Sequence, residues 1–251
     1  MIRKKAEGVE WLEFELLAEI PSLCHGVFLR HGGVSKAPFD SLNLGGENGD
    51  DPFAVAHNRS VVLKTLGLES LVSGRQTHGT DLLNVPTTDP QLEESCDGLF
   101  TKNGSLGLLI KHADCQAALF YNPVQKKIGA VHCGWRGNVA NIYAKAVAFM
   151  GGNPADLLVC ISPSLGPLSA EFKNYAGEFP ASFSPFKVGA TCYFDLWALS
   201  RFQLEEAGLL PHHIQIAEIC NYCHPEDFFS YRREKVSGRN GTVIALQKDF
   251  F

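Results

Sequence analysis

Three short apolar segments in the middle of the chain restrict its fold more than any other feature. They are residues 106–110 (LGLLI), 116–121 (QAALFY) and 128–131 (IGAV), and turn-forming residues bound each of them. Short apolar runs without polar alternation are typical of strands that are buried on both faces. A chain with such strands must cover its sheet with further layers, and 251 residues are enough to do so.

Helical periodicity provides those layers. Asp51-Pro52 opens a helical stretch in which Val55, Arg59, Val62 and Leu66 recur at helical spacing before Gly67. A second helix is predicted to end at Met150. Its apolar face begins at Val139, Asn138 is its predicted N-cap, and Gly151-Gly152 ends it.

A further strand is predicted at 157–161 (LLVCI) and a further helix at 195–207 before Gly208. Because strands and helices are interleaved, we predict an α/β (α+β) fold, with a mixed β-sheet flanked by helices. No repeat, low-complexity tract or linker divides the chain, so residues 1–251 are expected to form a single layered domain. The Gly/Asn/Asp-rich stretch 32–52 is predicted to be a long loop, and long loops in compact domains are usually functional.

Charge and leader patterns exclude several functional classes. The net charge of −5 shows no basic excess of the kind that nucleic-acid or membrane-surface binding needs. Arg3-Lys4-Lys5 resembles the start of a signal peptide, but four glutamates follow by residue 15, so no apolar export segment forms. No apolar run reaches the length of a membrane span. We therefore expect a cytoplasmic protein.

Eight cysteines in a reducing compartment indicate metal-binding, catalytic or buried thiols rather than disulfides. Cys24, Cys160 and Cys192 lie in or beside apolar stretches and are expected to be inert core residues. The string Cys220-Asn221-Tyr222-Cys223-His224 matches the attachment motif of c-type haem, but that attachment normally follows export, so a haem is not expected here.

Three polar segments lie at predicted element ends: Gln76-Thr77-His78-Gly79, His112-Ala113-Asp114-Cys115 and 132–137 (HCGWRG). Element ends at one edge of a sheet can converge on a site. One cysteine thiolate and two imidazoles, from His78, Cys115 and His132, would bind zinc with an open fourth position, as in catalytic sites. The alternative is that these side chains only form hydrogen bonds in a core, because no pair of them has the short spacing of a metal motif.

The segment Gly134-Trp135-Arg136-Gly137 adds a candidate anion site, because free backbone N–H groups and a guanidinium both favour phosphate. The alternative is that Trp135 packs in the core and Arg136 pairs with a carboxylate. Cys133 follows His132 directly and should point to the opposite face of an extended segment, so we do not expect it to be a ligand.

Eight ordered motifs along most of the chain resemble the YfiH-like family, also labelled multicopper polyphenol oxidase or laccase-like. They are LRHGGVS (29–35), SLNLGGENGDDP (41–52), the NR pair (58–59), RQTHG (75–79), CDGLFT (96–101), ADC (113–115), HCGWRG (132–137) and FFSYRR (228–233). The resemblance implies zinc ligands at the His of QxHG, the Cys of ADC and the His of HxGWRG, which are His78, Cys115 and His132.

The resemblance also implies an enzyme: a zinc-dependent purine nucleoside phosphorylase. Such enzymes use phosphate to convert adenosine, inosine or guanosine to base and ribose 1-phosphate, and methylthioadenosine cleavage and adenosine deaminase activity are attributed to members. A peptidoglycan-precursor editing hydrolase, a copper-dependent polyphenol oxidase and a non-catalytic metal-binding module are the alternatives. Copper is disfavoured because the chain has no His-x-His pair and only Met1 and Met150 as axial candidates.

Arginines in family-like motifs, Arg30, Arg59 and Arg136, are predicted to bind the phosphate, and Asn43 the nucleoside. His112 or Asp114 is predicted to act as acid or base, or to support a ligand imidazole. The chain departs from the family pattern at Cys133 (usually Ala), Ala117 (usually Pro) and Asn221 (usually Thr), and also near 170–172, where the pocket can differ. The expected partners are thus purine nucleosides and phosphate, while the sequence leaves the oligomeric state open.

Overall fold

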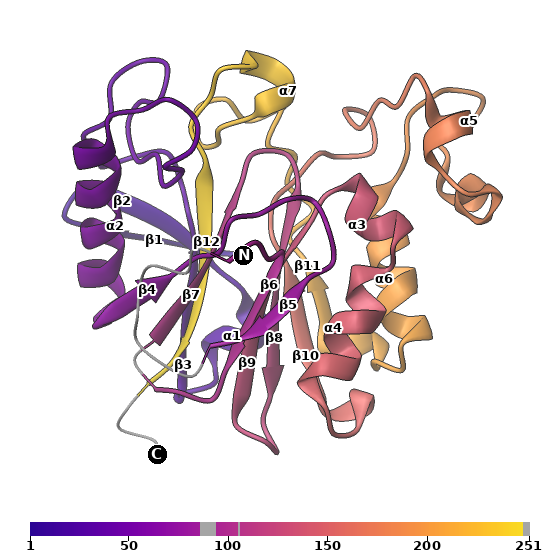
Figure 1. Cartoon of the computed structure of the whole chain (residues 1–251), viewed down its shortest axis with the longest axis horizontal. Helices are drawn as coiled ribbons and strands as arrows, with labels where there is room; N and C mark the ends of the chain where they lie inside the picture. The colour runs from indigo at the N-terminus through magenta and orange to yellow at the C-terminus, as the bar shows by residue number, and fades with distance from the viewer. Residues whose placement is uncertain (86–93, 105, 248–251) are drawn as a thin grey trace.

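Two mixed β-sheets form the centre of the molecule (Figure 1). This computed structural model describes residues 1–85, 94–104 and 106–247. The first sheet contains, in spatial order, β1 (Ile2–Ala6), β2 (Val9–Glu13), β3 (Leu23–Phe28), β12 (Asn240–Leu246), β7 (Leu106–His112) and β4 (Ser70–Val72). The second contains β11 (Ile214–Ile216), β10 (Leu158–Ile161), β8 (Gln116–Asn122), β9 (Lys127–Cys133), β6 (Gly98–Thr101) and β5 (Leu82–Asn84). Most neighbours are antiparallel, whereas the pairs β4–β7, β5–β6 and β10–β11 are parallel.

The three central apolar segments are strands, as predicted; β7 and β8 extend beyond the predicted carboxyl end, and β9 extends at both ends. In β7, Leu108 and Ile110 pack into the core between the two sheets, whereas Leu109 faces the outer side of the first sheet. In β8, Leu119 faces the same central core and Phe120 the outer side of the second sheet. Successive side chains of these strands therefore enter different cores, which explains why the segments are apolar without alternation.

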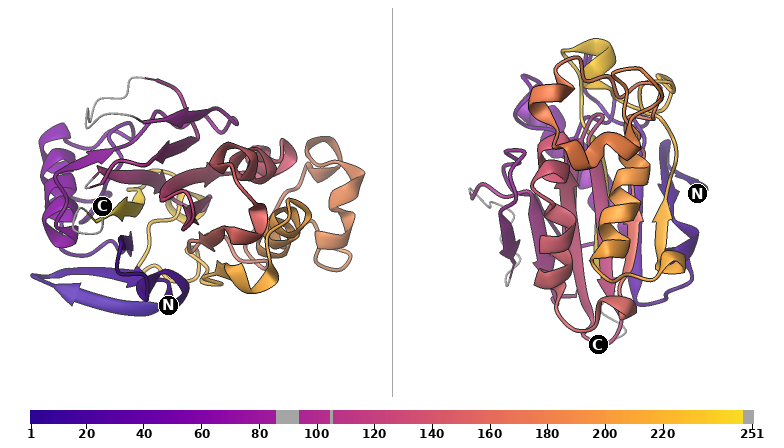
Figure 2. Two further views of the ribbon diagram at one scale, coloured as in Figure 1. Left: turned by 90° about the horizontal axis from the view of Figure 1, so that it is seen from below. Right: turned by 90° about the vertical axis from the view of Figure 1, so that its right-hand side faces the viewer.

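Helices cover both outer faces (Figures 1 and 2). Helix α2 (Pro52–Leu66) packs on the first sheet, while α4 (Ile142–Met150) and α6 (Leu196–Glu206) lie side by side on the second. The short helices are α1 (Glu15–Ala18), α3 (Trp135–Val139), α5 (Tyr175–Glu178), α7 (Tyr231–Glu234) and the 3-10 turns η1 (Pro154–Asp156), η2 (Ala181–Phe186) and η3 (Pro211–His213). The predicted α+β class with helix-flanked mixed strands is confirmed, but the strands divide between two sheets rather than forming one.

Helix α2 has the predicted ends. The side chain of Asp51 accepts a hydrogen bond from Phe53 N at 3.0 Å, and Gly67 closes the helix with φ +64°. Helix α6 likewise starts after Asp195, whose carboxylate accepts a hydrogen bond from Ala198 N at 2.9 Å. None of the described helices combines the length and the hydrophobicity that crossing a bilayer requires.

The predicted start of the helix that ends at Met150 is wrong. Residues 135–150 form two helices, and Asn138 lies inside the first, where its Oδ1 accepts a hydrogen bond from Ser200 Oγ at 3.3 Å. The cap of α4 is Asn141, which adopts φ +50° and accepts a hydrogen bond from Ala144 N at 3.2 Å. Asparagine tolerates this left-handed conformation better than most residues, so the break falls there.

Candidate metal site and its cavity

The structure brings His78, Cys115 and His132 together: one ligand atom from each lies within 4.8 Å of the others. His78 lies between β4 and β5, and Cys115 between β7 and β8. Both connections carry the chain from the first sheet to the second, and His132 lies near the end of β9 beside them. The site therefore forms where the chain crosses from one sheet to the other, at the upper end of the molecule in Figure 1.

The backbone around the three side chains is unusual. His78 has φ +61° and Asp114, next to Cys115, has φ +91°, a region that few residues other than glycine adopt. Such conformations persist where surrounding contacts enforce them, and they cluster at functional sites. Gly134 has no room for a side chain, because a Cβ there would lie 3.0 Å from His78 Cδ2 and 3.1 Å from Cys115 Sγ.

Asp97 orients two of the three residues. Its fully buried carboxylate accepts a hydrogen bond from His132 Nδ1 at 2.8 Å and from His78 N at 3.0 Å. It also accepts hydrogen bonds from Gly79 N, Thr77 N and Thr77 Oγ1 at 2.7, 3.2 and 3.2 Å. Burial by itself would raise the pKa of this carboxyl, but the hydrogen bond from His132 and the backbone donors hold it at about 2. With Nδ1 of His132 occupied, Nε2 is the nitrogen left to coordinate a metal.

The charge balance favours a thiolate at Cys115. Burial alone would raise the pKa of its thiol, but the adjacent imidazole of His132 lowers the pKa to about 6. The thiolate in turn raises the pKa of His132 against the effect of burial. A thiolate is the form of cysteine that binds metals.

Cys133 points away from this group. It is buried, its thiol lies 3.5 Å from the carbonyl oxygen of Gly134, and burial raises its pKa. It belongs to the core cluster beneath α4. The group of His78, Cys115 and His132 found among the described residues does not include it, and neighbouring residues of a strand point to opposite faces.

His112 and Asp114 form hydrogen bonds with residues other than His78 and His132. His112 is buried, pairs with Thr242 through Nε2 at 2.8 Å, and has its pKa lowered to about 3 by burial and then by His132. The carboxylate of Asp114 accepts hydrogen bonds from Ser230 Oγ at 2.6 Å and from Arg232 N at 2.5 Å, which ties the Cys115 loop to α7. Among the described residues, the side chain that bonds an imidazole of this group is the carboxylate of Asp97, whereas His112 and Asp114 bond other groups.

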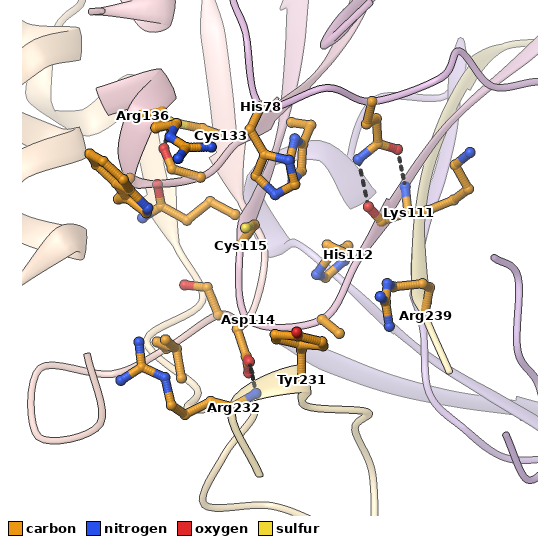
Figure 3. A pocket seen from close by; sticks show the side chains of 18 of the residues that line it. His78, Lys111, His112, Asp114, Cys115, Cys133, Arg136, Tyr231, Arg232 and Arg239 are labelled. Atoms are coloured by element: carbon orange, nitrogen blue, oxygen red, sulfur yellow. Dashed lines mark hydrogen bonds between the residues drawn. The ribbon is translucent and has the colours of Figure 1, made fainter. Parts of the chain in front are cut away.

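The group opens into a cavity of about 850 Å³ (Figure 3). Aromatic side chains of Trp135, Phe172 and Tyr231 line it, together with the glycine-rich turn 45–46. Six cationic side chains also line it: Lys111, Arg136, Lys173, Arg232, Lys235 and Arg239. A cavity of this size suits a small ligand with both apolar and anionic parts.

One of the four predicted substrate residues, Arg136, lines this cavity, where its guanidinium lies 5.0 Å from the centre of the Trp135 ring. Trp135 is partly buried against a phenylalanine-rich cluster. Arg136 has no ion pair with a carboxylate in the described part of the chain. Arg136 is the second residue of helix α3, which has only five residues.

The other three lie outside the lining. Arg30 binds the carbonyl oxygens of Asp40 and Pro225. Arg59 donates two hydrogen bonds to the Leu44 carbonyl, at 3.0 and 3.2 Å. The buried side chain of Asn43 bonds within its own loop and accepts a hydrogen bond from Arg239 N at 2.8 Å.

Sequence analysis missed several residues of the site, chiefly Asp97, Lys111 and Arg239. Asp97 lies inside the quoted motif 96–101, directly before a strand, and that placement was the available signal. Gln116, next to Cys115, was also missed: its side chain bonds Leu196 O, Tyr143 Oη and Ser200 Oγ, which anchors the loop to α4 and α6.

The donor set fits a zinc ion. One thiolate and two imidazoles are its usual protein ligands, and three of them leave one position open. The missing side chain at Gly134 keeps space beside His78 and Cys115, and Asp97 leaves one His132 nitrogen available. A zinc ion there would polarise a substrate group or activate water.

Comparisons with known proteins agree with this architecture. Residues 24–247 match the family described as multi-copper polyphenol oxidoreductase laccase. The purine nucleoside phosphorylase YfiH of Escherichia coli K12 is 33% identical over 227 residues, which cover 86% of this chain and 91% of that protein. A purine nucleoside phosphorylase of Xylella fastidiosa Temecula1 is 36% identical over 234 residues, covering 86% and 89%.

Solved structures show the same fold. YlmD from Geobacillus stearothermophilus superposes with a TM-score of 0.87 at 28% identity, with 98% of each chain covered. The hypothetical protein YfiH of Bacillus licheniformis gives a TM-score of 0.85 at 27% identity, covering 98% of this chain and 99% of that one. The chain belongs to the laccase-like YfiH family of multi-copper polyphenol oxidoreductase-type proteins.

Proposed function

We propose that this protein is a zinc-dependent purine nucleoside phosphorylase, which cleaves adenosine, inosine or guanosine, and methylthioadenosine, with phosphate. The observation that carries the proposal is the cavity itself, which combines the His78–Cys115–His132 group with cationic and aromatic walls. The relatives named as purine nucleoside phosphorylases support it. Zinc is favoured over copper because neither Met1 nor Met150 lines the cavity to provide an axial thioether.

The reaction sets clear demands on the cavity. A phosphate oxygen attacks C1′ of the ribose, the bond from C1′ to the base nitrogen breaks, and its electron pair leaves with the base, which takes up a proton. The cationic side chains hold the phosphate through charge-assisted hydrogen bonds, and the aromatic side chains provide flat surfaces for base and sugar. Bringing phosphate and nucleoside together in one orientation supplies much of the rate enhancement.

Adenosine deamination belongs to the same proposal. It replaces the amino group at C6 of adenine by oxygen from water and releases ammonia, so it needs no phosphate. The two reactions therefore share the metal group but differ in their need for the cationic walls.

Product analysis tests the proposal. Purified, zinc-loaded protein should convert inosine to hypoxanthine and ribose 1-phosphate only when phosphate is present, and adenosine to inosine with or without it. Absence of phosphate-dependent cleavage of any purine nucleoside would refute the phosphorylase. Much faster turnover of a serine-bearing peptidoglycan precursor would instead indicate the editing hydrolase.

A further inference from the structure

Two cationic side chains, Lys111 and Arg239, line one side of the cavity, and a third lies close to Lys111 outside the lining. Lys111 is the last residue but one of β7 and Arg239 precedes β12, and these strands are paired there, with Gly241 opposite Lys111. Both residues line the cavity, on the opposite side of Cys115 from Arg136 and Arg232 (Figure 3). Arg59 approaches from α2 behind them and adds to the positive potential at Lys111. We call Lys111 and Arg239, with Arg59 behind, the Lys111–Arg239 wall.

The positive charge of this wall is only partly balanced: against the effect of burial, Glu47 raises the pKa of Arg59 and Lys111, and Cys115 and Asp114 raise that of Arg239. In the described part of the chain, no ion pair joins Lys111, Arg59 or Arg239 to a carboxylate. Their hydrogen-bond acceptors are neutral backbone carbonyls, those of Gly74, Leu44, Ser237 and Gly238. Burial lowers the pKa of all three groups, and Arg59 lowers that of Lys111 further. A bound dianion would provide the missing counter-charge.

The wall is also held in place. A Cβ at Gly45 would lie 2.6 Å from Arg239 Cγ, so the glycine turn packs directly against this side chain. Asn43 accepts a hydrogen bond from Arg239 N, and Arg59 binds the Leu44 carbonyl from the other side. The side-chain amide of Gln76 bonds both the N–H and the C=O of Lys111, at 2.9 and 2.7 Å. Donors fixed in this way lose little freedom when they bind an anion.

The opposite wall is less suited to a dianion. It carries the carboxylates of Asp114 and Glu171, whereas the carboxylate that lines the cavity near Lys111 and Arg59 is that of Glu47, an exposed residue. Arg232 already donates from Nη1 to the Glu171 carbonyl at 2.9 Å, and Arg136 is exposed beside Trp135. Carboxylates repel phosphate, whereas Trp135 and Phe172 on this side suit a base or sugar.

We propose that the Lys111–Arg239 wall is the subsite for inorganic phosphate, and that the nucleoside lies across the metal group against Trp135 and Phe172. The proposal rests on the proposed phosphorylase function, but it makes a claim about anion binding that is measurable without turnover. The guanidinium fork of Arg239 matches two phosphate oxygens, and Lys111 adds a point charge.

Steady-state kinetics provide the first test. Lys111→Met and Arg239→Gln should each raise the KM for phosphate roughly 10- to 100-fold, with the KM for inosine within about 3-fold of wild type. Arg239→Lys should have an intermediate effect, because it keeps the charge but loses the fork. Arg75→Gln is the matched control, since Arg75 is exposed, contacts Ser95 and does not line the cavity. An Arg136→Gln variant with a larger rise in the phosphate KM would overturn the assignment.

Calorimetric titration with inorganic phosphate alone separates this inference from the function. The wild-type protein should bind phosphate, and Lys111→Met and Arg239→Gln should weaken binding roughly 10-fold or more, while Arg75→Gln should not. Thermal unfolding and circular dichroism identify any variant that fails to fold, and Arg239→Lys serves in its place. If phosphate binding is lost only in the wall variants but no nucleoside is cleaved, the subsite stands and the phosphorylase does not. If cleavage proceeds with an unchanged phosphate KM in these variants, the subsite is wrong and the phosphorylase stands.

Discussion

A single carboxylate, Asp97, organises most of the proposed metal group. It receives donors from His132, His78, Thr77 and Gly79, which belong to two separate segments of the chain. Outer carboxylates of this kind set the orientation and basicity of a ligand imidazole. The positions of two of the three proposed ligands therefore depend on one residue that binds no metal itself.

Asp97→Asn should weaken zinc binding roughly 10- to 100-fold. The side-chain amide of the asparagine has only one oxygen, and its NH2 group would face N–H groups that need an acceptor. The negative charge opposite His132 is lost as well, so the buried hydrogen-bond network is weakened. Competition with a zinc chelator measures the affinity. Asp81→Asn, an exposed change of the same charge next to β5, is the control. Equal zinc affinity in the Asp97 and Asp81 variants would show that the carboxylate is not needed.

Neighbouring cysteines should behave differently. Cys115→Ala should remove bound zinc, whereas Cys133→Ala should keep zinc and activity and lower stability by about 1 kcal/mol, because it only trims a buried side chain. Elemental analysis and urea unfolding of both variants give the two quantities. Zinc retained in Cys115→Ala would move the site elsewhere, with Cys220 and Cys223 next to test; these lie together around Ser169.

At the scale of elements, the connections between sheets matter more than the strands. The loops after β4 and β7 each pass from the first sheet to the second, and each delivers one proposed ligand at the same end. Gln116 then anchors the second loop to the helices on the outer face. Helix α3 begins at Trp135, directly after Gly134, where the side chain is missing beside His78 and Cys115.

A buried histidine couples α1 to β3 and should make stability depend on pH. His25 Nε2 accepts a hydrogen bond from Phe14 N at 2.8 Å, and burial lowers the pKa of the ring to about 4. The unfolded chain takes up this proton near pH 6.5, whereas the folded chain resists it down to about pH 4, so stability falls as the pH decreases between these values. The expected loss from pH 7 to pH 5 is about 2 kcal/mol.

Urea unfolding at pH 7 and pH 5 measures this dependence. His25→Gln should remove most of that part of the pH dependence, whatever its effect on stability at pH 7. His57→Gln, at an exposed position of α2, should leave it unchanged. The assignment fails when wild type and His25→Gln lose the same stability over this range.

At the scale of the whole molecule, the layers enclose a central core between two sheets, and the proposed metal group closes one end of it. His78, Cys115 and His132 lie 17 to 54 positions apart along the chain, so a shared ion would link distant segments. An ion that binds only the folded state raises the free energy of unfolding. The gain grows with the logarithm of the ratio of the free ion concentration to Kd.

Removing zinc should therefore lower the thermal midpoint. An excess of about 100 times Kd corresponds to roughly 2.7 kcal/mol, which is several degrees for a chain of this size. Differential scanning calorimetry before and after chelation, with zinc returned at the end, measures the shift. Cys115→Ala, which already lacks a ligand, should show little change; a shift as large as that of wild type would mean that the stabilising ion lies elsewhere.

The sequence by itself determined the local structure that depends on neighbouring residues. The central strands and the ends of α2 follow from apolar runs, Asp-Pro and Gly67, because these preferences act over a few residues. The three proposed metal ligands were also predicted, from donor chemistry together with motif resemblance. None of these predictions required knowledge of the distance between segments.

Only the tertiary structure decided the division into two sheets, the choice of Asn141 over Asn138, and the roles of Asp97, Lys111 and Arg239. Each depends on contacts between segments that are distant in sequence. A carboxylate before a strand, or a lysine at a strand end, has no distinctive local pattern. Such a charged residue becomes important only when folding buries it away from water, because its charge must then be balanced by the groups that the fold places beside it.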